Sequence, residues 1–581
     1  MNSISTGQSA GGTPAPISTI PSLTFESLTF SDGTTIALDA TDIVLFVGPN
    51  NAGKSLVLRE LEEHIGQPME GKVVRAAQLR RTGEFEDVRK LVEQNSRIDD
   101  SDPRHRRYVG SGLNVLTHML EHAWQHDPSQ LRPLFCERIA TENRIVDSNP
   151  QGGIALLTQF PGHPIHILYK YDDVERRISG YFRQAFGQDL SVFRLGGNSW
   201  PLLVGDRPAV LPDEDRLSTT YNERLVAATV PLQDQGDGMR SFATVILRML
   251  ALGNHSLLLL DEPEAFLHPP QARLLGEFIA KERPQHAQLF IATHSPDVLQ
   301  GLLNAAPGHL RVVRLKRDGT VNRVKELDKA LARKISADPV MKFTSVLSGV
   351  FHQRVIICES DADCMFYSSI LDIPDVHGSQ FPDVLFVQAG GKHRMAALAE
   401  ALRALDVDVD VIADFDLLND ETVLERLVKA LDGDWVKVYA DAHPLKAAIE
   451  QHKPWLNAGE VAKGVREILD NAPLAGEFPR NLREEIEAIF RKASPWDAIK
   501  AAGRAAVPGG DATKHYGQLQ ALCNAFGLWI VPVGELEGFC KSEGRHGPAW
   551  VQNVMENHNL ATDPQLAEAR AFVKDVWDRL Y

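Results

Sequence analysis

Two kinds of residue group in this chain could take part in binding or catalysis: a glycine-rich loop ending in lysine and serine, and acids that follow apolar runs. The loop reads Gly48-Pro49-Asn50-Asn51-Ala52-Gly53-Lys54-Ser55. A G-x-x-x-x-G-K-S loop between a strand and a helix binds nucleotide phosphates, because its backbone N–H groups and the helix N-terminus point at the phosphate oxygens. Lys54 would reach the β- and γ-phosphates, and the Ser55 hydroxyl would bind Mg²⁺.

A second group of polar residues lies at the ends of two later apolar runs. Asp261 and Glu262 follow four leucines, and His294 follows the apolar run 287–292. The aspartate would hold Mg²⁺, usually through water, and the glutamate would orient or deprotonate the attacking water. The histidine could sense the γ-phosphate. With the glycine-rich loop, these residues predict a site for ATP and Mg²⁺.

A short glycine motif precedes the second group. Gly236 and Gly238 open an apolar helical pattern over 242–252. A helix that begins with glycines exposes backbone N–H groups, so this helix end is another place where an anion can bind. The motif gains weight from its position just before the acids of the ATP site.

A third group of acids lies in the C-terminal part of the chain. Five acids lie at or shortly after the end of an apolar run: Glu359, Asp414, Asp416, Glu535 and Glu537. The apolar runs between 355 and 413 alternate with helical patterns. This alternation predicts a parallel sheet whose strand ends share one edge. Clustered carboxylates repel unless a cation neutralises them, and oxygen ligands select Mg²⁺ or Mn²⁺. The sequence therefore predicts a second metal site.

The first two groups, with a glycine turn between them, resemble a known ATPase. The segments GPNNAGKS, GDGMRS, LLLLDEPE and ATHS resemble the ABC/SMC/RecF superfamily, above all its OLD (overcoming lysogenization defect) type. The resemblance covers about 23–327, and QGDGMR stands where these proteins usually have L-S-G-G-Q. In such ATPases two heads sandwich ATP and each signature turn completes the other head's site. The resemblance thus implies a homodimer or a higher homo-oligomer.

The third group resembles the Toprim fold of OLD-family nucleases, which DnaG-type primases and topoisomerases share. By this resemblance Glu359 is the acid of the first motif, with Asp363 beside it. The couple Asp414 and Asp416 binds metal, and the remaining two glutamates of the group complete a second metal position. Ser360 stands where the family commonly has glycine.

The family also carries a lysine near the scissile phosphate. Lys541 is the first candidate for that lysine, and Lys392 and Lys514 are alternatives. Two divalent cations at about 3.5–4 Å suit phosphodiester hydrolysis. The resemblance therefore implies an ATPase fused to a metal-dependent endonuclease that nicks or cleaves duplex DNA. It also implies a role in bacterial defence against phage, and some relatives pair with a separate helicase.

The expected architecture is α/β, an ABC/RecF-like ATPase with a helical insertion followed by a Toprim domain with its own helical insertion. With 581 residues the chain exceeds the size of a single core. The expected segments are a flexible tail (1–22), the ATPase (23–327, with a helical or dimerisation insertion at about 72–220), a helical linker (328–352), the Toprim nuclease (353–545, with an insertion at about 445–522) and a C-terminal helical tail (546–581).

Composition narrows the class of protein. The net charge of −16 argues against a general nucleic-acid coat, although it permits a local basic channel. Five scattered cysteines and no C-x-x-C argue against a zinc site and fit a reducing cytoplasm. No apolar run approaches membrane-spanning length, so we expect no membrane partner.

Other classes of protein share some of these motifs. A RecF- or SMC-like repair ATPase with a non-cleaving acidic domain has no need for acids at three separate strand ends. A topoisomerase needs a nucleophilic tyrosine in a breakage domain, and a primase needs a zinc-binding template module, neither of which the sequence indicates. A transporter ATPase would not carry the acidic C-terminal domain.

Overall fold

The computed structural model describes residues 20–66, 69–102, 104–155, 159–251, 255–305, 308–327, 345–379, 381–451, 458–470, 472, 479–491 and 495–579. The chain forms two compact units, Met1–Asp338 and Pro339–Tyr581. Each unit has its own mainly parallel sheet. Within the described residues, no helix combines the length and the apolar character that crossing a membrane requires.

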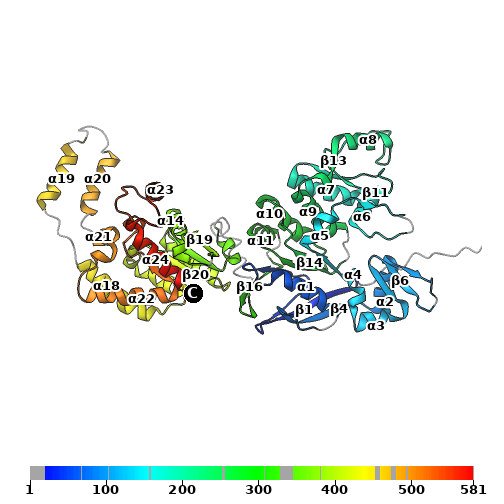
Figure 1. The fold of residues 1–581 in the computed structure, drawn as a ribbon, viewed down its shortest axis with the longest axis horizontal. Coiled ribbons are helices and arrows are strands. Elements are labelled where there is room, and N and C mark those ends of the chain that lie inside the picture. The colour runs from blue at the N-terminus through cyan, green and yellow to red at the C-terminus, as the bar shows by residue number, and fades with distance from the viewer. Residues whose placement is uncertain are drawn as a thin grey trace, which may run out of the picture. The chain divides into compact units, whose positions relative to one another are not determined.

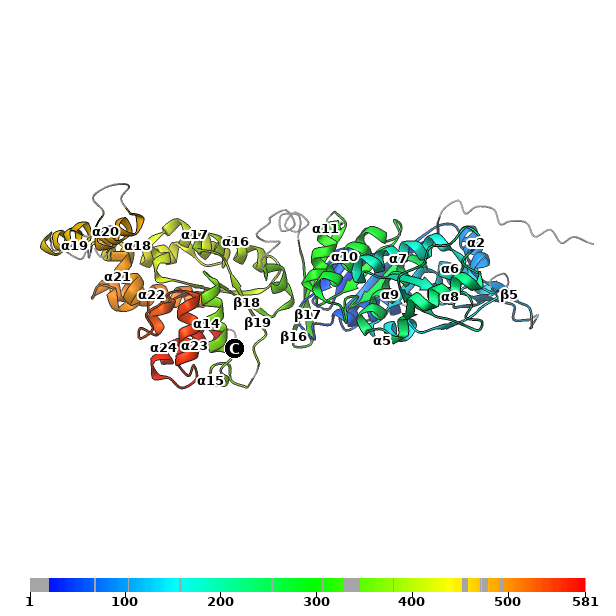
Figure 2. The same cartoon turned by 90° about the horizontal axis from the view of Figure 1, so that it is seen from above.

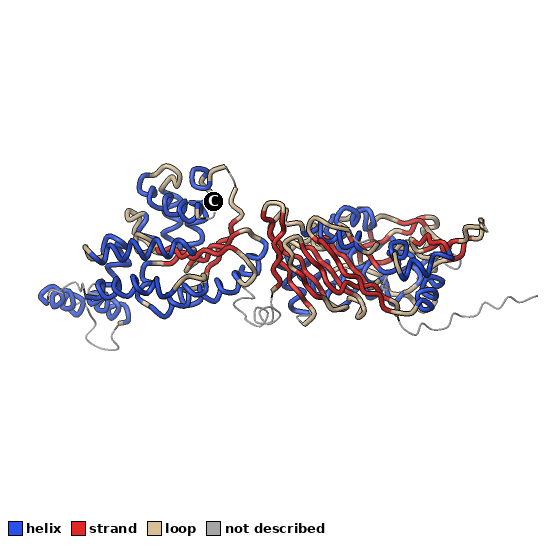
Figure 3. The backbone as a smooth tube through the Cα atoms, turned by 90° about the horizontal axis from the view of Figure 1, so that it is seen from below, coloured by secondary structure: helices blue, strands red, loops and turns tan. Residues whose placement is uncertain are grey.

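The central sheet of the first unit has, among the described residues, six strands in the order β17-β16-β3-β15-β14-β8. Only β17 is antiparallel to its neighbour. Figure 3 shows the strands side by side. Their bounds are β3 (Ile43–Val47), β8 (Cys136–Ile139), β14 (Leu257–Asp261), β15 (Gln288–Ala292), β16 (Leu310–Asp318) and β17 (Val321–Glu326). Strands β3, β14 and β15 are buried along their whole length, which explains their unbroken apolar runs.

Two layers cover this sheet (Figure 1). One face packs against α1 (Lys54–His64) and a small antiparallel sheet in the order β2-β1-β4. The other face lies against α9 (Asp237–Ala251), α10 (Pro269–Glu282) and α11 (Pro296–Ala305). The small sheet consists of β1 (Ser22–Phe30), β2 (Thr35–Ala37) and β4 (Val74–Thr82). As a result, the helix that follows the glycine-rich loop is held between two apolar layers.

The segment 72–220, expected as a helical or dimerisation insertion, contains strands as well as helices. It contributes β4 to the small sheet and β8 to the central sheet, where β8 pairs with β14. Its other elements are α2 (Phe85–Asn95), β5 (Arg97–Asp99), β6 (Arg107–Gly110), β7 (Leu113–Leu116), α3 (Leu120–Gln125), α4 (Arg132–Phe135), α5 (Thr141–Asp147), β9 (Gln151–Gly152), α6 (Pro164–Lys170), α7 (Asp172–Phe186), β10 (Asp189–Val192), β11 (Ser199–Trp200), β12 (Leu202–Gly205) and the start of α8 (Thr219–Ala228), which leads to β13 (Thr229–Pro231). Most of these strands are short, and β4 and β8 pair with strands outside the segment, so local patterns do not reveal them.

The second unit has a four-stranded parallel sheet in the order β19-β18-β20-β21 within its described part. Figure 2 shows α16 and α17 on one face of this sheet and α14, α23 and α24 on the other. The strands are β18 (Arg354–Cys358), β19 (Val384–Gln388), β20 (Asp408–Ala413) and β21 (Leu528–Ile530). The helices are α14 (Asp361–Leu371), α15 (Pro374–His377), α16 (Lys392–Arg403), α17 (Glu421–Ala430), α23 (Pro548–Asn557) and α24 (Ala567–Asp578).

The expected second insertion is helical but extends beyond 445–522. Its helices are α18 (Trp435–Gln451), α19 (Ala458–Asp470), α20 (Arg480–Arg491), α21 (Pro495–Ala502) and α22 (Asp511–Phe526). Helix α22 contacts β21, and its Tyr516 stacks on Phe415 directly after β20. This end of the segment is therefore part of the layer that covers the sheet.

The C-terminal segment 546–581, expected as a helical tail, carries α23 and α24, and both pack into the core of the second unit. Trp550 on α23 and Trp577 on α24 are buried in the same apolar cluster as strand β18. Of the expected linker, 328–344 lie outside the described residues, and a 3-10 helix spans Ser345–Phe351. Of the expected N-terminal tail, 1–19 lie outside the described residues as well.

Candidate functional site

The glycine-rich loop joins the buried end of β3 to α1. Gly48 has a φ of +138°, and a Cβ there would lie 2.1 Å from the carbonyl oxygen of Leu315, so only glycine fits. Gly53 has a φ of +91° and precedes the first turn of α1. Lys54 donates its Nζ hydrogens to the carbonyls of Gly48 and Pro49, both at 2.8 Å. The loop is thus closed by its own lysine, with the N-terminus of α1 open to a phosphate.

The strand-end acids predicted for this site lie beside the loop. Ser55 donates its hydroxyl hydrogen to Asp261 Oδ1 at 2.7 Å. Glu262 Oε1 lies 3.1 Å from His294 Nε2. Burial raises the pKa of Asp261, and burial followed by the charge of Lys54 lowers the pKa of His294. A serine and an aspartate in contact at a helix N-terminus match the ligand types of a nucleotide-bound Mg²⁺.

A cavity of about 410 Å³ lies over these groups. It is lined by the predicted residues Asn50, Asn51, Gly53, Lys54, Ser55, Glu262 and His294, and by Arg317. Arg317 comes from β16, and nothing in the local sequence marked it. The positive charge of Arg317 adds to that of Lys54, so the cavity suits a polyanion such as a nucleoside triphosphate.

Gly236 and Gly238 lie apart from this cavity's lining. Gly238 is at the start of α9, where a Cβ would lie 2.7 Å from the carbonyl oxygen of Phe266. The glycine therefore permits close packing against the segment that follows β14. Within one chain these two glycines do not contribute to the pocket that the loop and strand-end acids form.

In the second unit the predicted acids gather at the carboxyl edge of the sheet. Glu359 follows β18, and Asp414 and Asp416 follow the adjacent strand β20. Their carboxylate oxygens lie within 4.8 Å of one another. Burial, reinforced by Asp363 and Glu359, raises the pKa of Asp414 well above its usual range, and burial and Asp416 raise the pKa of Glu359. Such crowding of half-buried carboxylates is what a hard divalent cation relieves.

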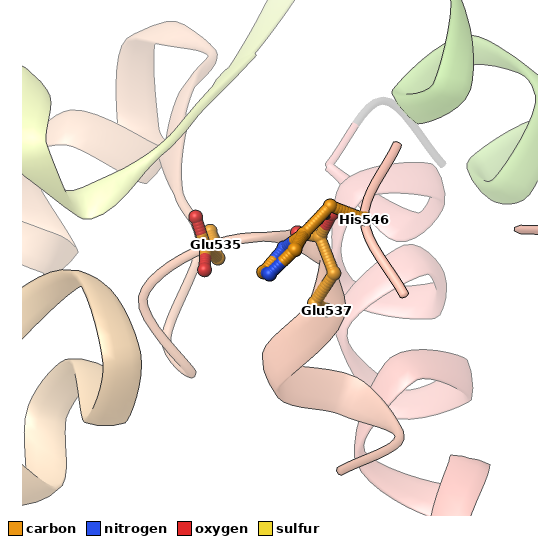
Figure 4. A group of neighbouring side chains, drawn as sticks. All are labelled: Glu535, Glu537 and His546. Atoms are coloured by element: carbon orange, nitrogen blue, oxygen red, sulfur yellow. Dashed lines mark ion pairs between the residues drawn. The ribbon is translucent and has the colours of Figure 1, made fainter. Parts of the chain in front are cut away.

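A second ligand group lies after β21, with Glu535 before the 3-10 helix Leu536–Phe539, Glu537 in it and His546 beyond it (Figure 4). One ligand atom from each of Glu535, Glu537 and His546 lies within 4.8 Å of the others. His546 Nδ1 is 3.5 Å from Glu537 Oε1, which also accepts a hydrogen bond of 2.7 Å from the backbone N–H of Gly547. His546 was not among the residues predicted from the sequence, because a histidine in an exposed Gly-Arg-His-Gly turn carries no local signal.

Asp363 lies close to these acids, and its carboxylate binds Ser360 at the start of α14. It accepts hydrogen bonds from the backbone N–H and the hydroxyl of Ser360, at 2.9 and 2.8 Å, and so caps α14. It belongs to neither of the two ligand groups found among the described residues. The serine at the position where the resemblance expects glycine therefore takes part in a capping box.

The lysines that lie at the acidic edge are not Lys541, the first candidate for the lysine near the scissile phosphate. Lys392 Nζ lies 3.3 Å from Asp416 Oδ2, and Lys500 Nζ lies 3.4 Å from Glu535 Oε2. Among the described residues no ion pair joins Lys541 or Lys514 to the acidic edge; Lys541 is exposed on a turn. Lys500 is carried by α21, far from the acids in sequence, so sequence spacing did not identify it.

The fold and the first site define an ATPase domain, and comparison with known proteins supports this. Residues 137–300 match the family model described as "AAA domain, putative AbiEii toxin, Type IV TA system". The chain is 21% identical over 179 residues to the Old nuclease of Escherichia phage P2, a match that covers 30% of each chain. The alignment therefore spans less than a third of that nuclease.

Three further matches are shorter or more distant. Over 88 residues, 14% of this chain, it is 30% identical to the uncharacterized protein MJECL11 of Methanocaldococcus jannaschii and covers 76% of that protein. The chain belongs to the same family as MJECL11, whose name assigns no activity. An SmcHead bound to the C-winged helix domain of ScpA matches 54% of this chain and 99% of its own, at 12% identity and a TM-score of 0.33. The SMC head domain from Thermotoga maritima matches 53% and 99%, at 11% identity and a TM-score of 0.29.

Proposed function

We propose that this protein is an ATP-binding and ATP-hydrolysing DNA endonuclease that depends on divalent metal and nicks or cleaves duplex DNA. The observation that carries the proposal is the convergence of Glu359, Asp414 and Asp416 within 4.8 Å at one edge of a parallel sheet. A non-catalytic fold has no need to crowd acids whose pKa values rise on burial. In this proposal the second unit is a Toprim nuclease domain of the OLD type.

The two ligand groups at the acidic edge have different donor chemistry. The Glu359, Asp414 and Asp416 group offers only oxygens, the ligand type of Mg²⁺, whereas the second group adds the imidazole of His546 and also suits Mn²⁺. Bound cations would supply an activated water and neutralise the leaving oxygen of a phosphodiester. Lys392 and Lys500 would orient the DNA phosphate, because the ammonium groups of both lie beside the acids at this edge.

The ATPase unit would control access of DNA to this edge. In the proposal two copies of the chain close around ATP, with Gly236 and Gly238 of one copy facing the nucleotide of the other. This arrangement accounts for a glycine turn that contributes nothing to the pocket of its own chain. Anti-phage defence, with or without a separate helicase partner, is the cellular role that the similarity to the Old nuclease favours.

Incubation of the protein with supercoiled plasmid, Mg²⁺ or Mn²⁺, and with or without ATP tests the proposal. We expect nicked and linear DNA from the parent protein. Activity should fall by about 100-fold or more in Glu359→Ala and Asp414→Ala, because each removes a ligand of the reacting centre. Agarose gels give the rates.

Lys54→Ala is the matched control, since it lies in the other unit. It should abolish ATP hydrolysis and leave the metal-dependent nicking seen without ATP at the parent rate. Plasmid cleavage at the parent rate by both acid variants would contradict the nuclease assignment. Binding of Mn²⁺ by the parent with no cleavage of any DNA would instead favour a RecF- or SMC-like repair ATPase with a non-cleaving domain.

A further inference from the structure

A buried arginine, Arg144, contacts the backbone of the strand-end acids of the ATP site and belongs to none of its sequence motifs. The Arg144 side chain on α5 is fully buried, at 0% exposure. Its Nη2 donates hydrogen bonds to Thr141 Oγ1 at 2.9 Å and to the backbone carbonyl of Asp261 at 3.1 Å. The Thr141 hydroxyl donates to the same carbonyl at 3.0 Å. Two side chains of α5 thus bind one backbone oxygen at the end of β14.

That oxygen belongs to the peptide that joins Asp261 to Glu262. The N–H of the same peptide, on Glu262, donates to the carbonyl of Ala292 at 2.8 Å. Both polar atoms of the peptide are therefore held. Glu262 has a φ of +46°, a left-handed conformation that costs energy for a residue with a side chain. Such a conformation persists where its surroundings hold it, and here it directs Glu262 toward His294, at 3.1 Å.

The charge of Arg144 matches its surroundings as well. Its neighbours Glu264, Asp261 and Glu262 are all acids, and they oppose the lowering of its pKa by burial. Glu264 is itself partly buried, and it accepts hydrogen bonds from Thr293 Oγ1 and from the backbone N–H of His294. Among the described residues, Arg144 Nε and Nη1 and Glu264 Oε2 have no hydrogen-bond partner. A buried arginine with unused donors is costly, which points to a role beyond packing.

The other side of α5 contacts α9. Thr244 of α9 donates its hydroxyl hydrogen to the carbonyl of Arg144 at 2.8 Å. Arg240, in the first turn of α9, donates to the carbonyl of Ile145 at 2.8 Å and to Asn149 Oδ1 at 3.0 Å. These contacts join α9, through one helical turn of α5, to the peptide that carries Glu262.

We propose that Arg144 is a positioning residue for ATP hydrolysis: it fixes the Asp261–Glu262 peptide so that Glu262 faces the nucleotide, and it joins this peptide to α9. It does not contact the nucleotide cavity, whose lining does not include it. It acts through Glu262. The inference concerns the ATPase alone, so it stands apart from the proposed nuclease activity.

Steady-state ATP hydrolysis by single variants tests this role. Arg144→Met, which removes the donor and the charge at similar length, should lower kcat about 100-fold with KM for ATP unchanged, because the loop that binds the phosphates is intact. Arg144→Lys, which keeps a charged donor, should recover most of kcat. Thr141→Val, which removes the second donor to the same carbonyl without changing charge, should lower kcat roughly 10-fold.

Arg248→Met is the matched control. Arg248 also lies between α9 and its neighbours, where it pairs with Asp147 and Glu137, but it makes no contact with the Asp261 carbonyl. Its loss should lower the melting temperature and leave kcat at the parent value. Equal kcat in the parent and Thr141→Val, or an equal fall of kcat in Arg144→Met and Arg248→Met, would overturn the proposal.

If Arg144→Met does not fold, Thr141→Val tests the hydrogen bonding to the Asp261 carbonyl alone, because this substitution leaves the buried charges in place. Parent protein that hydrolyses no ATP would refute the ATPase activity itself, whereas unchanged kcat in the variants would refute only the role of Arg144. Loss of plasmid cleavage bears on neither result.

Discussion

At the scale of single residues, the acidic edge of the second unit combines three demands on its side chains. In the proposed nuclease, the carboxylates must be close enough to share a cation, the cationic side chains of the protein must not displace that metal, and a positive group must remain for the DNA phosphate. Lys500 meets the last demand: it lies 3.4 Å from Glu535, and the pKa of the lysine rises because Glu535, Asp414 and Asp416 outweigh its burial. Lys541, the first candidate from sequence, lies on an exposed turn.

The two lysines make distinguishable predictions. Lys500→Ala should lower the rate of plasmid nicking by about 10- to 100-fold, because it removes a charge that would contact the phosphate. Lys541→Ala should cleave at the parent rate. Initial rates on supercoiled plasmid with Mn²⁺ measure both, and circular dichroism spectra control for folding. The reverse order of rates would restore Lys541 as the functional lysine.

At the scale of elements, the C-terminal helices complete the second unit. Asp410 on β20 is fully buried and binds two arginines, Arg354 of β18 and Arg579 after α24. Arg354 also donates to the carbonyls of Val576 and Trp577 in α24, at 3.0 Å for the Trp577 carbonyl. Both arginine contacts fasten the last helix to the sheet. Removal of one partner of such a group is costly, about 3–5 kcal/mol in comparable cases.

His558 connects the end of α23 to the turn before α24, and this link depends on pH. The Nδ1 of His558 lies 2.7 Å from Asp563 Oδ2 and its Nε2 lies 3.2 Å from Glu543 Oε1. The hydrogen bond to Asp563 is the largest cause of a raised pKa of His558, ahead of the opposing effect of burial. A histidine whose pKa is higher in the folded than in the unfolded state stabilises the fold when it is protonated.

The stabilisation that protonated His558 provides depends on pH. The stabilisation is fully present below the unfolded pKa of about 6.5 and is lost as pH rises through the higher folded value. Replacement by His558→Gln should therefore lower the melting temperature more at about pH 6 than at about pH 9. Thermal melts of parent and variant at both values measure this. A larger loss at the alkaline value would contradict the assigned ion pairs, and His377→Gln on α15 serves as a control.

At the scale of the whole molecule, the chain joins two compact units, each with its own candidate site. The first has a cavity lined by the glycine-rich loop and the strand-end acids, but its glycine turn at Gly236 and Gly238 contributes nothing to that cavity. A second copy of the chain would give this turn a function. The whole-molecule proposal is therefore a dimer that forms around ATP.

A variant that binds ATP but hydrolyses it slowly should accumulate this dimer. In Glu262→Gln the residue that would orient the attacking water is neutral, while the loop and Lys54 are intact, so hydrolysis should slow by about 100-fold or more. Light scattering should give the mass of two chains with ATP and a smaller mass without nucleotide. The same variant with Lys54→Ala should not respond to ATP. A single-chain mass for Glu262→Gln at saturating ATP would contradict dimer formation.

Local sequence determined the parts of this protein that depend on neighbours along the chain. The glycines of the phosphate loop, the apolar strands and the acids at their ends follow from backbone sterics and from the rule that parallel strands share one edge. Those features predicted both the ATP site and the convergence of Glu359 with Asp414 and Asp416.

The tertiary structure alone decided what depends on contacts between distant segments. It placed β8 beside β14 and brought Lys500 and His546 to the acidic edge. It also put Arg144 behind the peptide of Glu262. None of these has a local pattern, because a side chain's partner is set by how layers pack after the chain has folded, and packing joins residues that the sequence separates.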